Sequence, residues 1–199
     1  MNQSDLAFVR ERARGLDAEV WAEGSQLKAA TRTARRGRSL ELTHGHQLRS
    51  FTALADLAHQ RSEVAVAGWD VSAKEAIRYV AGPEAIRGEL ADDVGGAGVL
   101  ERAFGRRTET IAHALPGTRE EARWLAESHF KAIARRFVVG HGVAETQARL
   151  RVGAVVGLKN LGGLFDGDYY VIEARHRFDS DRGSWTEFAA ERAGLGRVP

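Results

Sequence analysis

The strongest constraint in this sequence is a pair of alternating runs near the C-terminus, separated by a short polar turn. We predict strands at 169–178 and 184–191, with the turn 179–183 between them. Side chains of a strand point to opposite sides in turn, so every second residue of each run shares one face. Shorter strand-like runs at 150–152 and 154–158 precede the pair. The pattern predicts an antiparallel β module at this end of the chain.

The N-terminal part combines a helix with several strands. Ser4 and Asp5 are typical of a helix start, apolar residues recur after them at helical spacing, and Gly15 is typical of a helix end. Runs at 20–22 and 27–31 flank a turn and predict a hairpin. The pattern then predicts a charged, glycine-containing loop at 32–38 and strands at 40–43, 48–54 and 63–70.

A second amphipathic helix is predicted to start at residue 118. Thr118 and Glu121 have the spacing of a capping box, and Gly140 is predicted to end the helix. The residues of its apolar stripe are Ala122, Leu125, Ala126, His129, Ile133 and Phe137.

The stretch before this helix suggests a division of the chain. Residues 82–117 are rich in glycine and hold two of the three prolines, so we predict that 88–105 is mostly loop. The expected domains are a helix, hairpin and β segment at 1–87, a loop or linker at 88–117, and a helix with a C-terminal β-barrel module at 118–199.

Composition excludes several classes of protein. The sequence has no cysteine, which excludes disulfide scaffolds, thiolate zinc sites, iron–sulfur clusters and cysteine nucleophiles. Its apolar runs are far shorter than the roughly 20 residues of a membrane-spanning helix, and its start lacks the apolar core of a signal peptide. We therefore expect a protein made in the cytoplasm without a membrane anchor. The 29 Lys and Arg residues nearly balance the 27 Asp and Glu residues, so net charge indicates no partner.

Two histidines keep a metal site open. His44 and His46 flank Gly45, and residues two apart on a strand face the same way, so the pair could hold a metal ion with a third ligand from elsewhere. A metal-dependent hydrolase is therefore one alternative function. The other interpretation of the pair is a polar strand end, and no cofactor is expected.

An arginine cluster keeps a second alternative open. Arg32, Arg35, Arg36 and Arg38 could contact phosphate, although no aromatic residues are interleaved with them. Contact between subunits is the other interpretation, because the planar guanidinium group pairs bidentately and suits interfaces. We treat these arginines and Trp69 as interface candidates, with an Arg-rich nucleic-acid-binding module as the alternative.

Two dispersed motifs are more specific than these clusters. Residues 4–9, Gly15 and the pair Val20 and Trp21 resemble the helix-then-strand segment of phage tail baseplate hub proteins and their relatives in contractile injection systems. The C-terminal part resembles the signature of the late control protein D family. The residues that carry this second likeness are Gly153, Phe165, Gly167, Tyr169, Val171, His176, Gly183, Thr186 and Phe188.

The resemblance implies a structural protein without catalytic residues. Such a VgrG-like hub forms a homotrimer that joins the sixfold tail tube to the threefold spike. The implied partners are further copies of the chain, the tail tube protein, a separate spike protein and other baseplate proteins, with nucleic acid not expected. The hub would assemble in the bacterial cytoplasm and then reside in a virion tail or an injection-system baseplate.

The expected fold class is α+β and mainly β, with barrel-like antiparallel β modules and two amphipathic helices, as in hub proteins. Barrel closure hides strand edges that would otherwise aggregate. Hub proteins normally have an N-terminal segment that builds a first barrel, so we expect either that this chain is a truncated or split hub or that another chain supplies the missing strands. Strands between residues 40 and 70 would then lack partners within the chain.

Overall fold

Long-range strand pairing organises the chain into two units in the computed structural model, which describes residues 3–35 and 40–196. Each unit gathers stretches that are far apart in sequence. The first unit combines 3–35, 60–89 and 97–134, and the second combines 40–59, 90–96 and 135–196.

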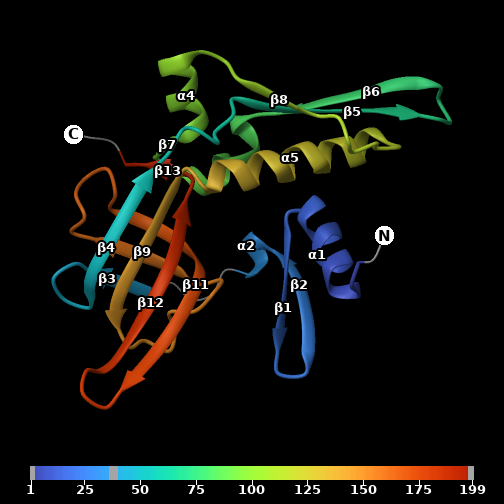
Figure 1. Ribbon diagram of the computed structural model, residues 1–199. Helices are drawn as coiled ribbons and strands as arrows, with labels where there is room; N and C mark the ends of the chain where they lie inside the picture. The colour runs from blue at the N-terminus through green and yellow to red at the C-terminus, as the bar shows by residue number, and fades with distance from the viewer. Residues whose placement is uncertain (1–2, 36–39, 197–199) are drawn as a thin grey trace. The chain divides into compact units, whose positions relative to one another are not determined.

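The second unit is built on one six-stranded sheet. Its strands are β3 (Leu40–Thr43), β4 (Leu48–Ala55), β9 (Val138–Glu145), β10 (Val155–Lys159), β11 (Gly167–Asp179) and β12 (Gly183–Arg192). They follow the order β3, β10, β11, β12, β9, β4, and all neighbours are antiparallel except β3 and β10. A short turn joins the two outermost strands, and His44 forms a β-bridge with Leu48 there. The sheet therefore curls into a half-barrel (Figure 1), which confirms the predicted barrel-like, mainly β fold class.

Aromatic rings form the centre of the half-barrel core. Phe51 of β4 meets Tyr169 of β11 edge-on, with 5.4 Å between ring centroids, and stacks on Phe188 of β12 at 6.0 Å. Burying a side chain of this size stabilises a fold by about 1.5–3 kcal/mol. The aliphatic side chains buried in this unit include Leu42, Leu48, Val138, Val156, Leu158 and Val171.

The strand β9 corrects the prediction that the second long helix runs to Gly140. The helix ends at Arg135, and Gly140 and Gly142 lie inside a strand between β12 and β4. Two glycines weaken the strand pattern in the sequence. They occur here because aromatic rings lie against the backbone: a Cβ on Gly140 would lie 2.7 Å from Cε1 of Phe51, and one on Gly142 would lie 2.5 Å from Cε1 of Phe188.

The start of the first unit confirms the predicted helix and hairpin. Its elements are α1 (Asp5–Gly15), β1 (Ala18–Glu23), β2 (Gln26–Thr31) and the one-turn helix α2 (Arg32–Arg35). The Ser4 hydroxyl caps α1 by accepting the N–H of Ala7 at 3.3 Å. β1 and β2 pair antiparallel. The prediction of a loop at 32–38 was wrong for residues 32–35, which form α2. Arg36 and Arg38 lie outside the described residues.

A three-stranded sheet and a long helix complete the first unit. They are β5 (Glu63–Asp70), β6 (Glu75–Ala81), β8 (Thr108–Ile111) and α5 (Arg119–Arg135), with β5 in the middle of the sheet. Polar pairs link α5 to both edge strands. The Tyr79 hydroxyl donates to Oε1 of Glu127 at 3.0 Å, and Nε2 of His129 lies 3.1 Å from Oε1 of Glu109.

The start of α5 has the Thr118 cap that its sequence predicts, and Glu121 reaches back to the residue before the cap. Oγ1 of Thr118 accepts the N–H of Glu121 at 3.1 Å. The Glu121 carboxylate in turn accepts the N–H of Gly117 at 2.9 Å. Both bonds satisfy N–H groups that have no partner within the helix, so α5 begins where the pattern predicts.

The stretch predicted to be mostly loop contains regular structure instead. Residues 88–105 include the end of α3 (Arg87–Leu90), β7 (Val94–Gly95) and α4 (Gly96–Phe104). The short helix η1 (Pro83–Ile86) precedes them, and β13 (Gly194–Leu195) pairs with β7. Its glycines serve close packing as well as turns. A Cβ on Gly95 would lie 3.1 Å from Cδ1 of Leu90. Glycine is required at such a close contact, so a high glycine content does not distinguish close packing from a flexible loop.

Two further expectations need correction. Residues 150–152 do not form a strand: they lead into a turn at 152–153, where Gly153 has φ 90°. The strands between residues 40 and 70 are paired within the chain: β3 with β10, β4 with β9, and β5 with β6 and β8. Of the helices in the described part, none has the length and apolar character needed to cross a membrane.

Candidate functional site

The residues that carry the late control protein D likeness gather on β11, β12 and the loops before β11. Gly153 supports this region from a turn, where its N–H donates to the carbonyl oxygen of Val171 at 3.0 Å. Its φ of 90° favours glycine. Gly183 has φ 74° and begins β12 after the hairpin turn. These glycines set the chain path, and neither supplies a reactive group.

Tyr169 and Phe165 meet at the base of β11. The buried Tyr169 hydroxyl donates to the carbonyl oxygen of Phe165 at 2.9 Å, and burial raises the pKa of this phenol. The Arg192 guanidinium lies over the Tyr169 ring, 5.6 Å from its centroid. The tyrosine is therefore held from both its ring face and its hydroxyl.

Arg192 is the centre of a buried polar cluster that the sequence did not indicate. Its Nε and one terminal nitrogen donate to the two carboxylate oxygens of Asp93 at 2.7 and 2.6 Å, and the other terminal nitrogen donates to the Asp166 carbonyl at 2.6 Å. Its side chain is 7% exposed. We call this arrangement the Arg192 clamp, and it ties the segment before β7 to the end of β12.

Gly167 completes the clamp. A Cβ at this position would lie 2.6 Å from Cζ of Arg192, and the residue has φ 141°. The late control protein D likeness includes Gly167, and close packing against a guanidinium group gives a physical reason for glycine there. Sequence reasoning missed Asp93 and Arg192 because 98 residues separate them and neither belongs to a motif.

His176 and Thr186 form a cross-strand pair farther along the hairpin. Nδ1 of His176 lies 2.9 Å from Oγ1 of the buried Thr186. The pair therefore links the two strands of the hairpin through their side chains. Phe188, two residues on, packs in the core with Phe51.

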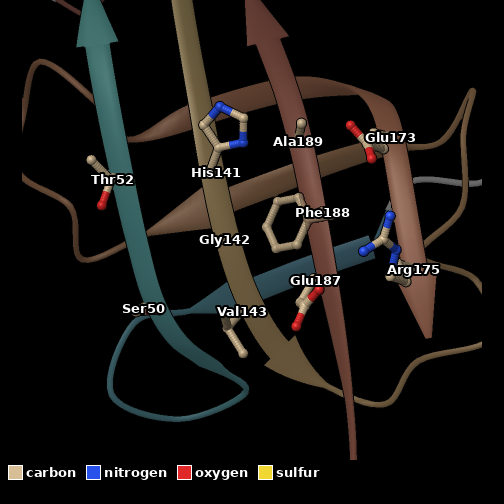
Figure 2. Close-up of a pocket in the computed structure, with 10 residues that line it drawn as sticks. All are labelled: Ser50, Thr52, His141, Gly142, Val143, Glu173, Arg175, Glu187, Phe188 and Ala189. Atoms are coloured by element: carbon tan, nitrogen blue, oxygen red, sulfur yellow. The ribbon is translucent and has the colours of Figure 1, made fainter. Parts of the chain in front are cut away.

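The opposite face of the same sheet is hollowed over four strands. Figure 2 shows this hollow, which has a volume of about 380 Å³. Strands β4, β9, β11 and β12 contribute its lining residues: Ser50, Thr52, His141, Gly142, Val143, Glu173, Arg175, Glu187, Phe188 and Ala189. Strand alternation places the polar residues here on the side away from the aromatic core. The polar lining suits recognition of another surface.

Glu187 is the most constrained charge in the hollow. Its carboxylate accepts from Nε1 of Trp185 at 3.1 Å and from Nε of Arg177 at 3.3 Å. The hydrogen bond from Trp185, together with that from Arg177 and the charge of Arg175, holds the pKa of Glu187 below its ordinary value. The contacts therefore favour the ionised carboxylate.

This lowered pKa predicts a small acid sensitivity. The stabilisation by Glu187 is present above the ordinary glutamate pKa and is lost as the pH falls through the lower folded-state pKa. We expect the urea midpoint to fall less between about pH 6 and about pH 3 in Glu187→Gln than in the wild type. Identical pH profiles would show that these contacts do not stabilise the folded state. Glu173→Gln, in the same hollow, is the matched control.

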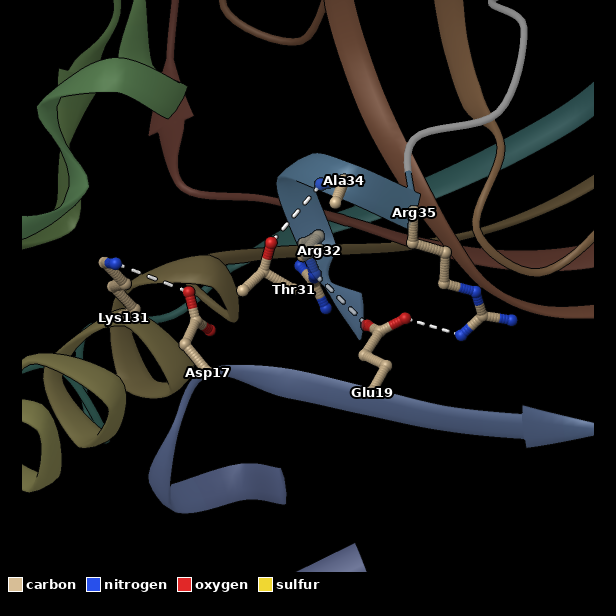
Figure 3. Close-up of polar contacts among 7 residues, drawn as sticks. All are labelled: Asp17, Glu19, Thr31, Arg32, Ala34, Arg35 and Lys131. Carbon is tan, nitrogen blue, oxygen red and sulfur yellow. Dashed lines mark hydrogen bonds and ion pairs between the residues drawn. The ribbon is translucent and has the colours of Figure 1, made fainter. Parts of the chain in front are cut away.

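The arginines proposed as an interface are held within the chain where they are described (Figure 3). Nε of Arg32 lies 3.3 Å from one oxygen of Glu19, and a terminal nitrogen of Arg35 lies 2.5 Å from the other. The Arg35 guanidinium also stacks over Trp21, 4.4 Å from the ring centroid. Arg32 is 9% exposed. The two side chains thus fasten α2 to β1.

The base of the hairpin is anchored by a second pair. Nζ of Lys131 in α5 lies 3.4 Å from Oδ2 of Asp17, which has φ 54° at the turn between α1 and β1 (Figure 3). Trp69, the remaining interface candidate, is 54% exposed near the end of β5. The structure does not bring Trp69 into the Arg32 cluster.

The histidine pair does not have the geometry that a metal site needs. His44 lies in a β-bridge and His46 in the following turn, so the two do not share a strand face, and both are exposed. Gly45 between them has φ 87° and bends the chain. Within 3–35 and 40–196, no three His, Cys, Asp or Glu side chains lie where they could hold a metal ion together.

Comparison with known proteins finds one matching family model and several solved structures with a similar fold. Residues 1–180 match the family model described as the Alg8 N-terminal domain. A search of curated proteins finds no match. Among solved structures, the tail protein from Neisseria meningitidis MC58 is 12% identical with a TM-score of 0.64, over 98% of this chain and 56% of that one.

Two other solved structures have the same fold. The 43 kDa tail protein of prophage MuSo2 from Shewanella oneidensis is 10% identical with a TM-score of 0.68, over 96% of this chain and 54% of that one. A chain of the native gene transfer agent virion is 16% identical with a TM-score of 0.53, over 96% of this chain and 39% of that one. This chain thus spans about half the length, or less, of these structures, and the likeness establishes a shared fold.

Proposed function

The chain belongs to the Alg8 N-terminal domain family, and from this premise and its fold we propose that it is a structural tail protein, the baseplate hub of a phage tail or a contractile injection system. The observation that carries the proposal is the curled six-stranded half-barrel within a fold that phage tail proteins share. The proposed role is assembly, without catalysis and without a cofactor.

The architecture suits an adaptor between unlike partners. One chain supplies two units, each with two sheets of its own. A hub needs two different surfaces on one ring, because the tube above and the spike below have different symmetry. The polar hollow of the half-barrel is a surface of the kind that protein contacts use, with charged groups of both signs around a small apolar floor.

The proposed assembly is a homotrimer that binds the tail tube protein, a separate spike protein and other baseplate proteins. It would form in the bacterial cytoplasm and then reside in the tail or the injection-system baseplate. We expect genes for tube, sheath and spike proteins beside the gene for this chain. The full set of neighbouring genes would show whether the assembly is a phage tail or an injection system.

Mass measurement in solution tests the proposal. The chain is purified alone and then mixed with the spike and tube proteins encoded beside it. We expect a particle of three times the 21.7 kDa chain mass, either at once or after the spike protein is added. A stable dimer that ignores the spike protein, or a chain that binds neither protein, would contradict the hub role.

A further inference from the structure

The helix α1 is packed on very little of its surface. Of its eleven residues only Ala13 is buried, while Leu6 is 43% exposed, Phe8 49% and Val9 37%. Helices shorter than about 12–15 residues are marginal in water, and packing of an apolar face supplies most of their stability in proteins. Leu6 and Val9 are three residues apart, so they lie on one side of α1 and form a partly exposed apolar face, whereas Phe8 lies on the far side of the helix from Leu6.

Charged side chains surround this face and are mostly basic. α1 has Arg10, Arg12 and Arg14 in its second half. Arg12 lies over the Phe8 ring, 5.2 Å from its centroid, and Glu11 accepts a hydrogen bond from Gln3. Arg10 and Arg14 have no ion-pair partner in the described part of the chain. The face therefore favours a partner that is both apolar and acidic.

The tip of the β11–β12 hairpin has that chemistry. Phe178 is 78% exposed there, the most exposed aromatic side chain among the described residues. Asp179 and Asp181 follow it, and Glu145 of β9 lies in register with Trp185 of β12 beside the tip. These three carboxylates outnumber the two guanidinium groups beside them, at Arg182 in the turn and at Arg177, which also pairs with Trp185 and donates to Glu187.

The tip is rigid enough to dock without a large loss of entropy. Oδ1 of Asp179 accepts the N–H groups of Asp181 and Arg182 at 2.9 and 2.8 Å, which fixes the turn. The long strands behind it pair from Tyr170 to Asp179. A preorganised tip with an aromatic anchor resembles the residues that dominate binding energy at protein interfaces.

We propose that the β11–β12 tip of one copy docks on the exposed face of α1 of a neighbouring copy. Phe178 packs against Leu6 and Val9, and the carboxylates at the tip lie beside Arg10 and Arg14, which follow Leu6 along the same side of α1. The contact joins two different surfaces, so its repetition builds a ring when the rotation closes. This inference rests on the proposed self-assembly of the hub and names the contact that carries it.

The exposed Leu6 and Val9 beside the arginines favour a protein over a nucleic acid as the occupant. Phosphate binding requires cationic side chains and gains nothing from exposed aliphatic groups. A polyanion is therefore one of the outcomes that the test must distinguish.

Charge reversal tests the contact. We expect Arg10→Glu/Arg14→Glu, and separately Glu145→Arg/Asp181→Arg, to weaken self-association at least about tenfold in sedimentation equilibrium. A chain with all four changes restores opposite charges between the changed positions and should recover most of the lost affinity. Arg78→Glu/Arg149→Glu changes net charge equally on exposed positions outside both surfaces and should have little effect.

Cross-linking gives a readout that does not depend on the charge variants. The chain has no cysteine, so Val9→Cys in one batch and Asp181→Cys in another provide a single thiol each. We expect a disulfide-linked dimer on oxidation of the mixture and much less from either batch alone.

The possible outcomes separate this contact from the hub proposal. Self-association that charge reversal leaves unchanged, without a cross-link in the mixture, overturns the contact and leaves the hub role standing. A chain that stays monomeric with and without spike protein overturns both. Reversal of Arg10 and Arg14 that abolishes heparin binding but not self-association overturns the docking of a second copy on α1.

Discussion

Replacing Gly140 by alanine is expected to destabilise the protein by about 3 kcal/mol, near the upper end of the usual cost of overpacking a core. The new Cβ would lie 2.7 Å from Cε1 of Phe51 and closer still to Cζ. That ring cannot retreat easily, because it contacts Tyr169 on one side and Phe188 on the other. The methyl group must therefore displace either β9 or the aromatic cluster.

Urea unfolding measures this cost, and a second glycine provides the control. Gly98 lies in α4 with open space around its would-be Cβ, so Gly98→Ala should stabilise the protein by about 0.5–1 kcal/mol. In a Phe51→Leu background, which shortens the opposing side chain, the cost of Gly140→Ala should fall to about 1 kcal/mol. An unchanged cost in that background would contradict the ring clash as its cause.

The same position explains where the sequence misled the prediction of the fold. The strands β11 and β12 were predictable because their alternation and their turn are local features. β9 was not, since Gly140 and Gly142 suggest a helix end and a flexible segment. Their role is visible once Phe51 and Phe188, from distant parts of the chain, lie against them. Long-range packing decided the structure here against the local pattern.

The residues that the sequence analysis singled out divide in the same way. Gly153 and Gly167 were identifiable from the family likeness, and the structure adds their physical reasons in backbone φ and close packing. The cluster of Arg32 and Arg35 was visible in the sequence as a concentration of charge. Its actual contact, Glu19 in β1, was not, because an arginine pattern does not identify the carboxylate that it meets. The lining of the hollow also comes from four separate strands, so no local motif could indicate it.

Removing the carboxylate of the Arg192 clamp is expected to cost about 3 kcal/mol. In Asp93→Ala the guanidinium of Arg192 stays buried with its two strongest acceptors gone, and breaking one side of a buried ion pair typically costs about 3–5 kcal/mol. The lower value applies because the Asp93 side chain is 20% exposed and water can partly replace it. The pairing of β7 with β13 should loosen as well, because Asp93 directly precedes β7.

The neighbouring residue, Asp92, provides the control for this prediction. Asp92 is exposed, so Asp92→Ala removes the same charge from the same segment and should change stability by no more than about 0.5 kcal/mol. Urea midpoints give the overall cost, and amide exchange at Val94 and Leu195 reports the local loosening. The difference between the two variants should survive high salt, because a buried pair is screened far less than surface charges. Equal midpoints for Asp92→Ala and Asp93→Ala would mean that the half-barrel does not depend on the clamp, and that Gly167 serves only the turn before β11.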